Sequence, residues 1–233
     1  MSNACAHAAL GVVLLERSMS HSPFSPLKLN LLSQFLHDQG KVLDVGCGKL
    51  HYARWIREHL PSVTIVALDL LQQESEERIL YRHVDLEAGI EEDTESFESV
   101  VVFDVIEHIS REEFFISELL RVLKPGGVLV GSVPHDADGF LPAYNLTFFH
   151  RSDLTHKRYY TQELLGDVLE TAGFSDVQIV LGGGISPHVM AEFFPAWSRW
   201  LVKKMVSVGL KLGVLTNGNL QSDLFFVAYK PLL

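Results

Sequence analysis

Short apolar runs recur along this chain, and residues at helical spacing separate several of them. The runs lie at 42–45, 63–68, 79–84, 99–103, 128–133, 174–181 and 224–229. Most are rich in valine, leucine or isoleucine, which is typical of strands that a parallel sheet buries on both faces. Between the first two runs, Tyr52, Trp55, Ile56 and Leu60 follow helical spacing. This alternation predicts an α/β fold.

End signals predict three further helices. Ser25 followed by Pro26 predicts a helix from 26 to near residue 40, because proline suits the first helical position. Ser110 and Glu113 form a capping-box pattern, so we expect a helix from about 111 to 123. Thr161 is expected to cap a helix that runs to 171.

Two glycines follow the first apolar run at once. Gly46 and Gly48 can take positive φ and let a ligand approach the backbone, because glycine has no Cβ. The turn delivers backbone N–H groups at the start of a helix, where they favour anionic or polar ligand groups. Asp69 closes the second run, about 20 residues further on, the offset at which an acid can accept hydrogen bonds from a ribose diol. This order predicts a nucleoside-containing ligand at the carboxyl end of the sheet.

The glycine pattern distinguishes between such ligands. A dinucleotide site requires a third glycine, but Lys49, Leu50 and His51 stand there, which argues against the alternative of an NAD-dependent oxidoreductase. Asp44, two residues before Gly46, suits a ligand with a cationic amino group and no pyrophosphate. The string DVGCG resembles the first motif of class I S-adenosylmethionine-dependent methyltransferases, commonly D/E-x-G-x-G-x-G. The chain departs from this motif at Leu50, which we expect to make the turn tighter against the ligand.

The resemblance covers residues 25–184 well and the last ten residues loosely, and LKPGGVLVGSVP is highly typical of these enzymes. It implies a Rossmann-like three-layer sandwich whose seven-stranded, mostly parallel sheet has the order 3-2-1-4-5-7-6, and S-adenosyl-L-methionine as cofactor. Its implied cofactor-binding residues are Asp44, Gly46 and Gly48 for the methionine portion, Asp69 and Leu70 for the ribose end, Asp85 and Leu86 for adenine, and Asp104. The alternative for Asp85 is a strand-end acid in solvent.

Histidines are the candidates for chemistry on the acceptor. Methyl transfer from a sulfonium is an in-line displacement, so the protein must align the acceptor and, for a hydroxyl, remove its proton. His108 follows the fourth run in a tripeptide that resembles the family's E-H-I at the reactive end of the cofactor, and His135 follows the fifth run. Either is a candidate catalytic base. The alternative for His108 is packing beneath the cofactor or capping a helix.

The segment THKRYYTQELLGDVLETAGF resembles an H-x-R-x-Y/F-T stretch of small-molecule methyltransferases. Tyr144, His156, Arg158 and Tyr159 are therefore candidates for an acceptor pocket, with a structural loop on the sheet edge as the alternative. Alternating acids after the fifth run more often form turns than metal sites. No His/Cys cluster with ligand spacing occurs in the sequence, so we expect a metal-independent enzyme.

The length and the pattern predict one domain spanning 1–233. Its expected accessory parts are an N-terminal helical cover at 1–40, an acceptor-side insertion at 134–158 and a helical lid at 187–213.

An apolar stripe at helical spacing marks the lid. It consists of Leu201, Met205, Val208 and Leu212, with the basic residues largely off it. A helix that packs on the core and roofs the acceptor pocket is favoured, and peripheral membrane contact through 193–212 is the alternative. Both imply an apolar or amphipathic acceptor.

Charge and cysteine content restrict partners and compartment. A formal net charge of −10 argues against a nucleic-acid partner, which usually requires a basic face. Two cysteines make no disulfide framework and fit a reducing compartment. The apolar run 4–15 is too short to span a bilayer and lacks a basic flank, so we expect a cytoplasmic protein without a signal peptide. The sequence assigns no oligomeric state.

These observations predict methyl transfer to a small-molecule acceptor, with O-methylation favoured. A protein or peptide methyltransferase is an alternative, because acceptor loops diverge freely on this fold. A cofactor-binding but inactive partner subunit is another, motivated by Leu50 and by the lack of an assigned base.

Overall fold

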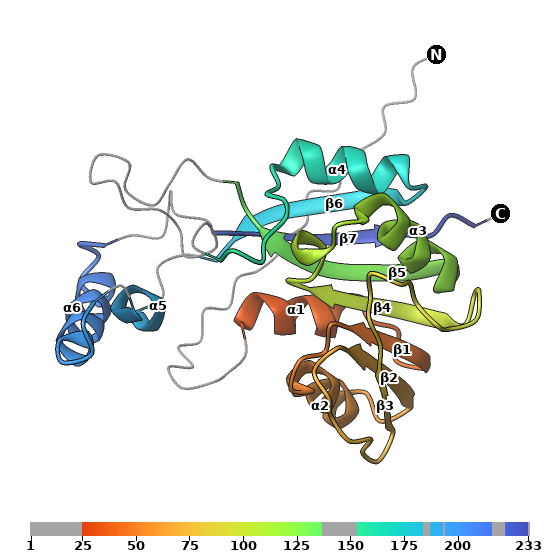
Figure 1. Ribbon diagram of the computed structural model, residues 1–233, viewed down its shortest axis with the longest axis horizontal. Coiled ribbons are helices and arrows are strands. Elements are labelled where there is room, and N and C mark those ends of the chain that lie inside the picture. The colour runs from red at the N-terminus through yellow and green to blue at the C-terminus, as the bar shows by residue number, and fades with distance from the viewer. Residues whose placement is uncertain (1–24, 137–152, 184–186, 193, 216–221, 233) are drawn as a thin grey trace.

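The computed structural model describes residues 25–136, 153–183, 187–192, 194–215 and 222–232. Within them, seven strands form one sheet in the order β3-β2-β1-β4-β5-β7-β6 (Figure 1). The strands are β1 (Gly40–Val45), β2 (Val63–Asp69), β3 (Ile79–His83), β4 (Phe97–Phe103), β5 (Leu123–Pro134), β6 (Ser175–Gly182) and β7 (Asp223–Tyr229). Neighbours pair in parallel except β7, which runs antiparallel to β5 and β6. The predicted fold class and strand order are confirmed.

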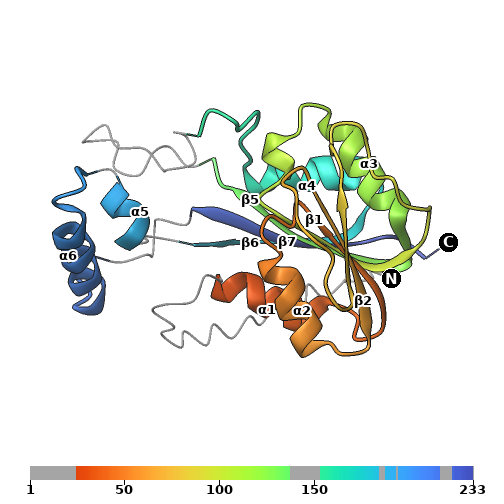
Figure 2. The same cartoon turned by 60° about the horizontal axis from the view of Figure 1, so that its bottom comes forward.

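Helices cover both faces of the sheet (Figure 2). They are α1 (Pro26–Phe35) and α2 (His51–His59) on one face, and α3 (Glu112–Val122) and α4 (Gln162–Thr171) on the other. Side chains alternate between the two faces along β1, which divides the core into two clusters. Leu43 and Val45 pack in the cluster that contains Phe115 of α3, whereas Val42 packs in the cluster that contains Ile56 of α2.

The structure shows whether the side-chain caps predicted for α3 and α4 form. Thr161 Oγ1 accepts a hydrogen bond from the Leu164 N–H at 3.2 Å, which confirms the cap of α4. The capping box at Ser110 was wrong, because α3 begins at Glu112 without a side-chain cap. The Ser110 N–H donates instead to Glu87 Oε1 at 2.7 Å. An acid distant in sequence therefore binds the backbone where a local cap was expected.

The structure describes the expected accessory parts incompletely. In the N-terminal cover, α1 begins at Pro26 as predicted but ends at Phe35, where Leu36 turns to an extended conformation. Much of the acceptor-side insertion, including Tyr144, lies outside the described residues. In the lid, α5 (Pro187–Glu192) and α6 (Arg199–Lys211) stand beyond the carboxyl ends of β4 and β5 (Figure 1).

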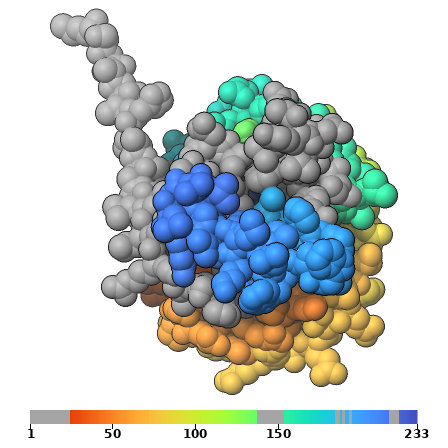
Figure 3. All heavy atoms as spheres, turned by 90° about the vertical axis from the view of Figure 1, so that its left-hand side faces the viewer, coloured from red at the N-terminus to blue at the C-terminus, as the bar shows by residue number. Residues whose placement is uncertain are grey.

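The apolar stripe of α6 is not buried against the core. Leu201, Met205 and Leu212 are exposed by 51%, 64% and 72%. The core-packing roof expected from the sequence is therefore wrong for this stripe, although α5 and α6 together cover much of one end of the molecule (Figure 3). Among the helices that the structure describes, none combines the length and the apolar character that crossing a bilayer requires.

Leu50 adopts the backbone conformation of the glycine that it replaces. Its φ of 61° and ψ of 21° lie in the left-handed region, which costs an L-residue with a side chain about 1–2 kcal/mol. The side chain is buried in the cluster that α1 and α2 form with the sheet. Leu50 therefore fills the core, contrary to the expectation that it narrows the turn against a ligand.

This backbone conformation predicts an unusual order of stability at position 50. Leu50→Ala removes a buried side chain and keeps the strained backbone, so the free energy of unfolding should fall by about 2–5 kcal/mol. Leu50→Gly loses the same side chain but relieves the strain, and should be more stable than Leu50→Ala by about 1 kcal/mol. Urea unfolding measures both.

Ala53→Gly in α2 is the matched control, because Ala53 is also buried but lies inside the helix. At this position the glycine variant should have a free energy of unfolding about 1 kcal/mol lower than that of the wild type, which has alanine. A Leu50→Ala protein as stable as Leu50→Gly would show that position 50 stores no strain.

Candidate cofactor and acceptor site

The glycine turn between β1 and α2 is fixed to the end of β2 and leaves space on one side. The N–H groups of Gly46 and Cys47 both donate to the Leu68 carbonyl, at 2.8 and 3.1 Å. Gly46 has a φ of 70°, and a Cβ there would overlap Val105 Cγ2. Gly48 has a φ of 53°, and a Cβ there would meet no atom within 4 Å. Only glycine fits at Gly46, whereas Gly48 borders open space that a ligand can enter.

Asp69, at the end of β2, lies against this turn. Its Oδ2 accepts a hydrogen bond from the Gly48 N–H, and its Oδ1 accepts one from the Leu71 N–H, both at 2.7 Å. These bonds orient the carboxylate and leave each oxygen a further lone pair for a ribose hydroxyl. Leu70 is 63% exposed beside it. The structure thus brings the predicted ribose acid to the glycine turn.

Asp44 is a buried carboxylate with an unsatisfied oxygen. Its Oδ2 has no hydrogen-bond partner among the described residues. Burial and, next, the charge of Asp69 raise its pKa to about 7, although the Ala53 N–H opposes this shift. Leaving a buried polar atom unpaired is costly unless a ligand satisfies it. The orphaned oxygen and the space at Gly48 fit a ligand with a cationic amino group.

Asp85 and Leu86, the residues predicted to bind adenine, follow the end of β3. Asp85 is exposed, and its Oδ1 accepts a hydrogen bond from the Glu87 N–H at 3.0 Å. Leu86 is half-buried against the core. Their role at adenine stays a prediction.

Asp104 follows β4 and binds a lysine that the sequence analysis missed. Its carboxylate forms an ion pair with Lys28 of α1 and accepts a hydrogen bond from Ser132 Oγ at 2.6 Å. Lys28 is buried, with its ammonium 5.1 Å from the centre of the Phe103 ring. Burial lowers the pKa of Lys28, but the charge and hydrogen bond of Asp104, together with the charges of Tyr52 and Asp223, raise it overall. The only signal in the sequence was that Lys28 is the single charged residue of this helix.

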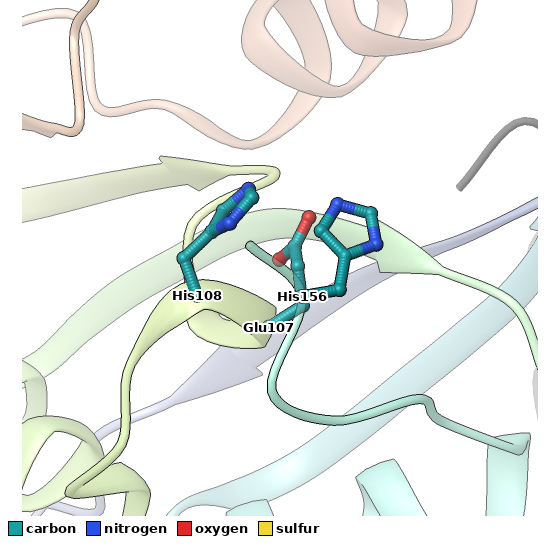
Figure 4. Close-up of side chains that lie close together, drawn as sticks. All are labelled: Glu107, His108 and His156. Atoms are coloured by element: carbon teal, nitrogen blue, oxygen red, sulfur yellow. The ribbon is translucent and has the colours of Figure 1, made fainter. Parts of the chain in front are cut away.

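Glu107, His108 and His156 form a cluster at the carboxyl end of β4. One ligand atom from each residue lies within 4.8 Å of the other two. The imidazole rings of His108 and His156 have centres 4.7 Å apart, and the close-up shows the Glu107 side chain beside both rings (Figure 4). The cluster is next to the glycine turn, because Val105, on the same loop, packs against Gly46. From the sequence, His108 was a candidate base and His156 a candidate acceptor residue, but nothing indicated that they lie together. Glu107 had no predicted role.

Glu107 belongs to a short 3₁₀ turn, η1 (Ile106–His108), and is fully buried. Neither carboxylate oxygen has a hydrogen-bond partner among the described residues. Burial, and then the charge of Asp104, raise its pKa to about 8. A carboxyl group in this state can act as a proton carrier or bind a cation.

Thr155 and Asp153 orient the two histidines. Thr155 Oγ1 lies 2.9 Å from His108 Nδ1 and 2.6 Å from Asp153 Oδ1. Asp153 Oδ2 lies 3.6 Å from His156 Nε2. Hydrogen bonds from the Thr155 hydroxyl and N–H hold the pKa of Asp153 below its usual range. The sequence gave no signal for Asp153 or Thr155, because their partner His108 is distant along the chain.

The other predicted acceptor residues are partly structural. Arg158 forms an ion pair with the buried Glu112 of α3, which also accepts a hydrogen bond from the Tyr160 hydroxyl. The Tyr159 ring lies edge-on to His156, with ring centres 6.0 Å apart. Arg158 therefore anchors the loop. Among the predicted acceptor residues that the structure describes, His156 belongs to the cluster and Tyr159 adjoins it.

His135 lies after β5 and is not a member of the cluster. Its backbone N–H donates to the Ser222 carbonyl at 2.9 Å. The backbone N–H of the next residue, Asp136, donates to the Tyr160 carbonyl at 2.7 Å. Its role as a base stays a prediction.

We expect Asp69→Asn to weaken binding of S-adenosylhomocysteine about 10- to 100-fold. The amide keeps the shape of the side chain but removes a charged acceptor, and such hydrogen bonds contribute about 1.5–3 kcal/mol. Calorimetric titration measures the effect. Asp38→Asn, an exposed acid before β1, is the control and should bind as the wild type does. Unchanged binding by Asp69→Asn would remove this acid from the cofactor site.

The raised pKa of Asp44 predicts a pH-dependent cofactor affinity. A cationic amino group binds the carboxylate form, so affinity should be constant above pH about 7 and fall up to tenfold per pH unit below it. Titrations from about pH 5 to about pH 8, the range in which proteins are usually most stable, measure this dependence. Asp44→Asn should bind more weakly at pH 8 and lose this dependence on pH. A wild-type affinity that does not change across this range would contradict the assignment.

Comparison with known proteins identifies the family. A family model described as a methyltransferase domain matches residues 19–179, which is more than half of the chain. The mitochondrial ubiquinone biosynthesis O-methyltransferase of Mus musculus is 29% identical over 190 residues, which cover 72% of this chain and 47% of that protein. A probable S-adenosylmethionine-dependent methyltransferase of Mycolicibacterium smegmatis is 33% identical over 150 residues, covering 60% and 54%. The chain spans about half the length of these two curated relatives.

A solved structure shares the fold. Phosphoethanolamine N-methyltransferase 2 of Haemonchus contortus, in complex with S-adenosyl-L-methionine, matches with a TM-score of 0.62 at 20% identity, over 88% of this chain and 52% of that one. At this identity the likeness concerns the fold alone. The family match is stronger because it covers most of the sheet and the whole glycine turn. The chain therefore belongs to the methyltransferase domain family.

Proposed function

We propose that this methyltransferase acts on a hydroxyl oxygen of a small acceptor that has an apolar part. The observation that carries the proposal is the pair of imidazoles, His108 and His156, at the end of β4 next to the glycine turn. A neutral amine already has a lone pair with which to attack a methyl group. A hydroxyl must lose its proton, and for that step histidines near the reacting atoms are useful.

S-adenosylmethionine supplies an electrophilic methyl group on a sulfonium. The residues at the end of β4 have to hold the acceptor oxygen in line and receive its proton. As the oxygen–methyl bond forms, the carbon–sulfur bond breaks and its electron pair stays on sulfur. The hydroxyl proton passes to the histidine cluster and then to solvent.

Two further observations support the proposal. The name of the mouse relative describes an O-methyltransferase of ubiquinone biosynthesis, which favours oxygen as the methylated atom. Leu201, Met205 and Leu212 expose apolar surface on α6, beyond the same end of the sheet. An acceptor with an apolar part could contact this surface, whereas a charged peptide would gain less there.

The test is transfer of an isotope-labelled methyl group to paired acceptors, followed by mass spectrometry. Each pair carries the same alkylated ring and differs only in a hydroxyl or an amine. We expect transfer to the hydroxyl compounds, and a fall in kcat of about 100-fold or more in His108→Asn. His37→Asn, which replaces an exposed histidine before β1, is the matched control and should keep wild-type kcat.

Other outcomes would favour the alternatives. Transfer to the amine partners alone would contradict O-methylation. Binding of S-adenosylhomocysteine without transfer to any acceptor, in a protein that co-purifies with a second subunit, would favour an inactive partner. Transfer to a peptide library but not to small acceptors would favour a protein methyltransferase.

A further inference from the structure

We propose that Glu107, His108 and His156 form a binding site for one divalent transition-metal ion. From the sequence we expected a metal-independent enzyme, because no His/Cys cluster with ligand spacing occurs along the chain. The fold instead brings together two adjacent residues of η1 and a third from a loop nearly fifty residues later. Two imidazole nitrogens and one carboxylate oxygen are a common ligand set for such ions.

The Glu107 carboxylate is the first reason for a cation. It is fully buried, and neither oxygen has a hydrogen-bond partner among the described residues. A buried carboxylate that served only the fold would be expected to have a partner, as Glu112 has in Arg158 and Tyr160. Lys28 does not fill this role, because its ammonium is bonded to Asp104. The close-up shows the carboxylate close to both imidazole rings (Figure 4).

The hydrogen bonds around His108 fix which ring nitrogen can bind a metal. The Thr155 hydroxyl has one proton, and it donates this proton to Asp153 Oδ1 at 2.6 Å. It must therefore accept from His108 Nδ1, which lies 2.9 Å away. The Nδ1 of His108 then carries the hydrogen, and Nε2 has the lone pair that metal binding requires. Metal-binding histidines are commonly oriented in this way by a hydrogen bond at the other nitrogen.

The second histidine, His156, is positioned by Asp153. Its Nε2 lies 3.6 Å from Asp153 Oδ2, so Nδ1 is the nitrogen expected to bind the ion. Its side chain is only 7% exposed. The backbone ties the two segments together, because the Lys157 N–H donates to the Glu107 carbonyl at 2.7 Å. The ligands are thus carried on a connected backbone, and Asp153 orients both histidines.

The spacing calls for at most a small contraction when an ion binds. Metal–ligand bonds of about 2.1 Å hold two ligand atoms at most about 4.2 Å apart, whereas the three atoms here lie within 4.8 Å of one another. Rotations of the side chains can supply the difference. The nitrogen-rich set favours zinc, cobalt, iron or manganese over calcium and magnesium, which prefer oxygen ligands.

Three protein ligands leave coordination positions open. If the proposed O-methylation is correct, an acceptor hydroxyl could occupy one of them, and the ion would lower the pKa of that hydroxyl. His108 would then act as a ligand, and the ion would promote the loss of the proton. This role rests on the proposed function, whereas the metal site does not.

The test is titration of Co²⁺ and Zn²⁺ into the untagged, chelator-treated full chain. Calorimetry gives stoichiometry and affinity, and the visible absorption of Co²⁺ reports its coordination. We expect one equivalent to bind, and the Kd to rise at least tenfold in Glu107→Gln and in His156→Asn. Thr155→Val, which removes the orienting hydroxyl, should raise the Kd by about 10-fold or more. His37→Asn is the matched control and should bind as the wild type does.

Glu107→Gln keeps the test decisive if a histidine variant fails to fold. The change preserves shape and removes a carboxyl group whose ionisation is opposed by burial, so the metal-free variant should unfold at or above the wild-type temperature. Failure of the wild type to bind one equivalent, or unchanged binding in folded Glu107→Gln, would overturn the site.

A methyl-transfer assay separates this proposal from the proposed function. Stoichiometric binding that Glu107→Gln abolishes, without transfer to any hydroxyl acceptor, supports the site and counts against O-methylation. Full transfer to a hydroxyl acceptor by chelator-treated protein that binds no ion overturns the site and leaves O-methylation standing.

Discussion

The parallel pairing of β1 with both β2 and β4 is the constraint on which the functional site depends. Val45 of β1 is in register with Leu68 of β2 and with Val102 of β4, so the three strands end at one edge. The residues that follow these strands therefore meet although they are distant in sequence. The Gly48–Asp69 hydrogen bond and the contact of Val105 with Gly46 are direct consequences. The same pairing explains why one edge carries both the glycine turn and the cluster of Glu107, His108 and His156.

Buried charges separate structural from functional carboxylates in this protein. Glu112 is buried but bonded to Arg158 and Tyr160, and Asp104 is bonded to Lys28 and Ser132. Such groups hold the loops around the site. Asp44 and Glu107 are also buried, yet each has oxygen atoms without a partner among the described residues. Removing a charge from water without pairing it is costly. Asp44 and Glu107 lie where a ligand would supply the missing partner. Asp44 is at the glycine turn, and Glu107 is in the cluster with His108 and His156.

The sequence was sufficient where a feature depends on local pattern or on a fixed offset. Apolar runs predicted the strands, and the offset from the glycines predicted Asp69, because a βαβ unit has a nearly constant length. Prediction failed where distant segments compete. Ser110 looked like a helix cap, but Glu87 from another loop binds its backbone. Leu50 was expected to narrow the turn against a ligand, but its side chain packs in the core. Lys28, Asp153 and Thr155 had no local signal, because their importance comes from partners on other elements.

The loop that carries His156 shows how the scaffold positions a residue of the cluster. On one side of His156 the Lys157 N–H is bonded to the Glu107 carbonyl, and further along Arg158 and Tyr160 are bonded to Glu112 of α3. On the other side, Asp153 and Thr155 are bonded to one another and reach His108. The ring of His156 is therefore placed by contacts to η1 and α3, which are themselves fixed by the ends of β4 and β5. A change at Glu112 would act on acceptor chemistry through the position of His156, although Glu112 lies outside the cluster.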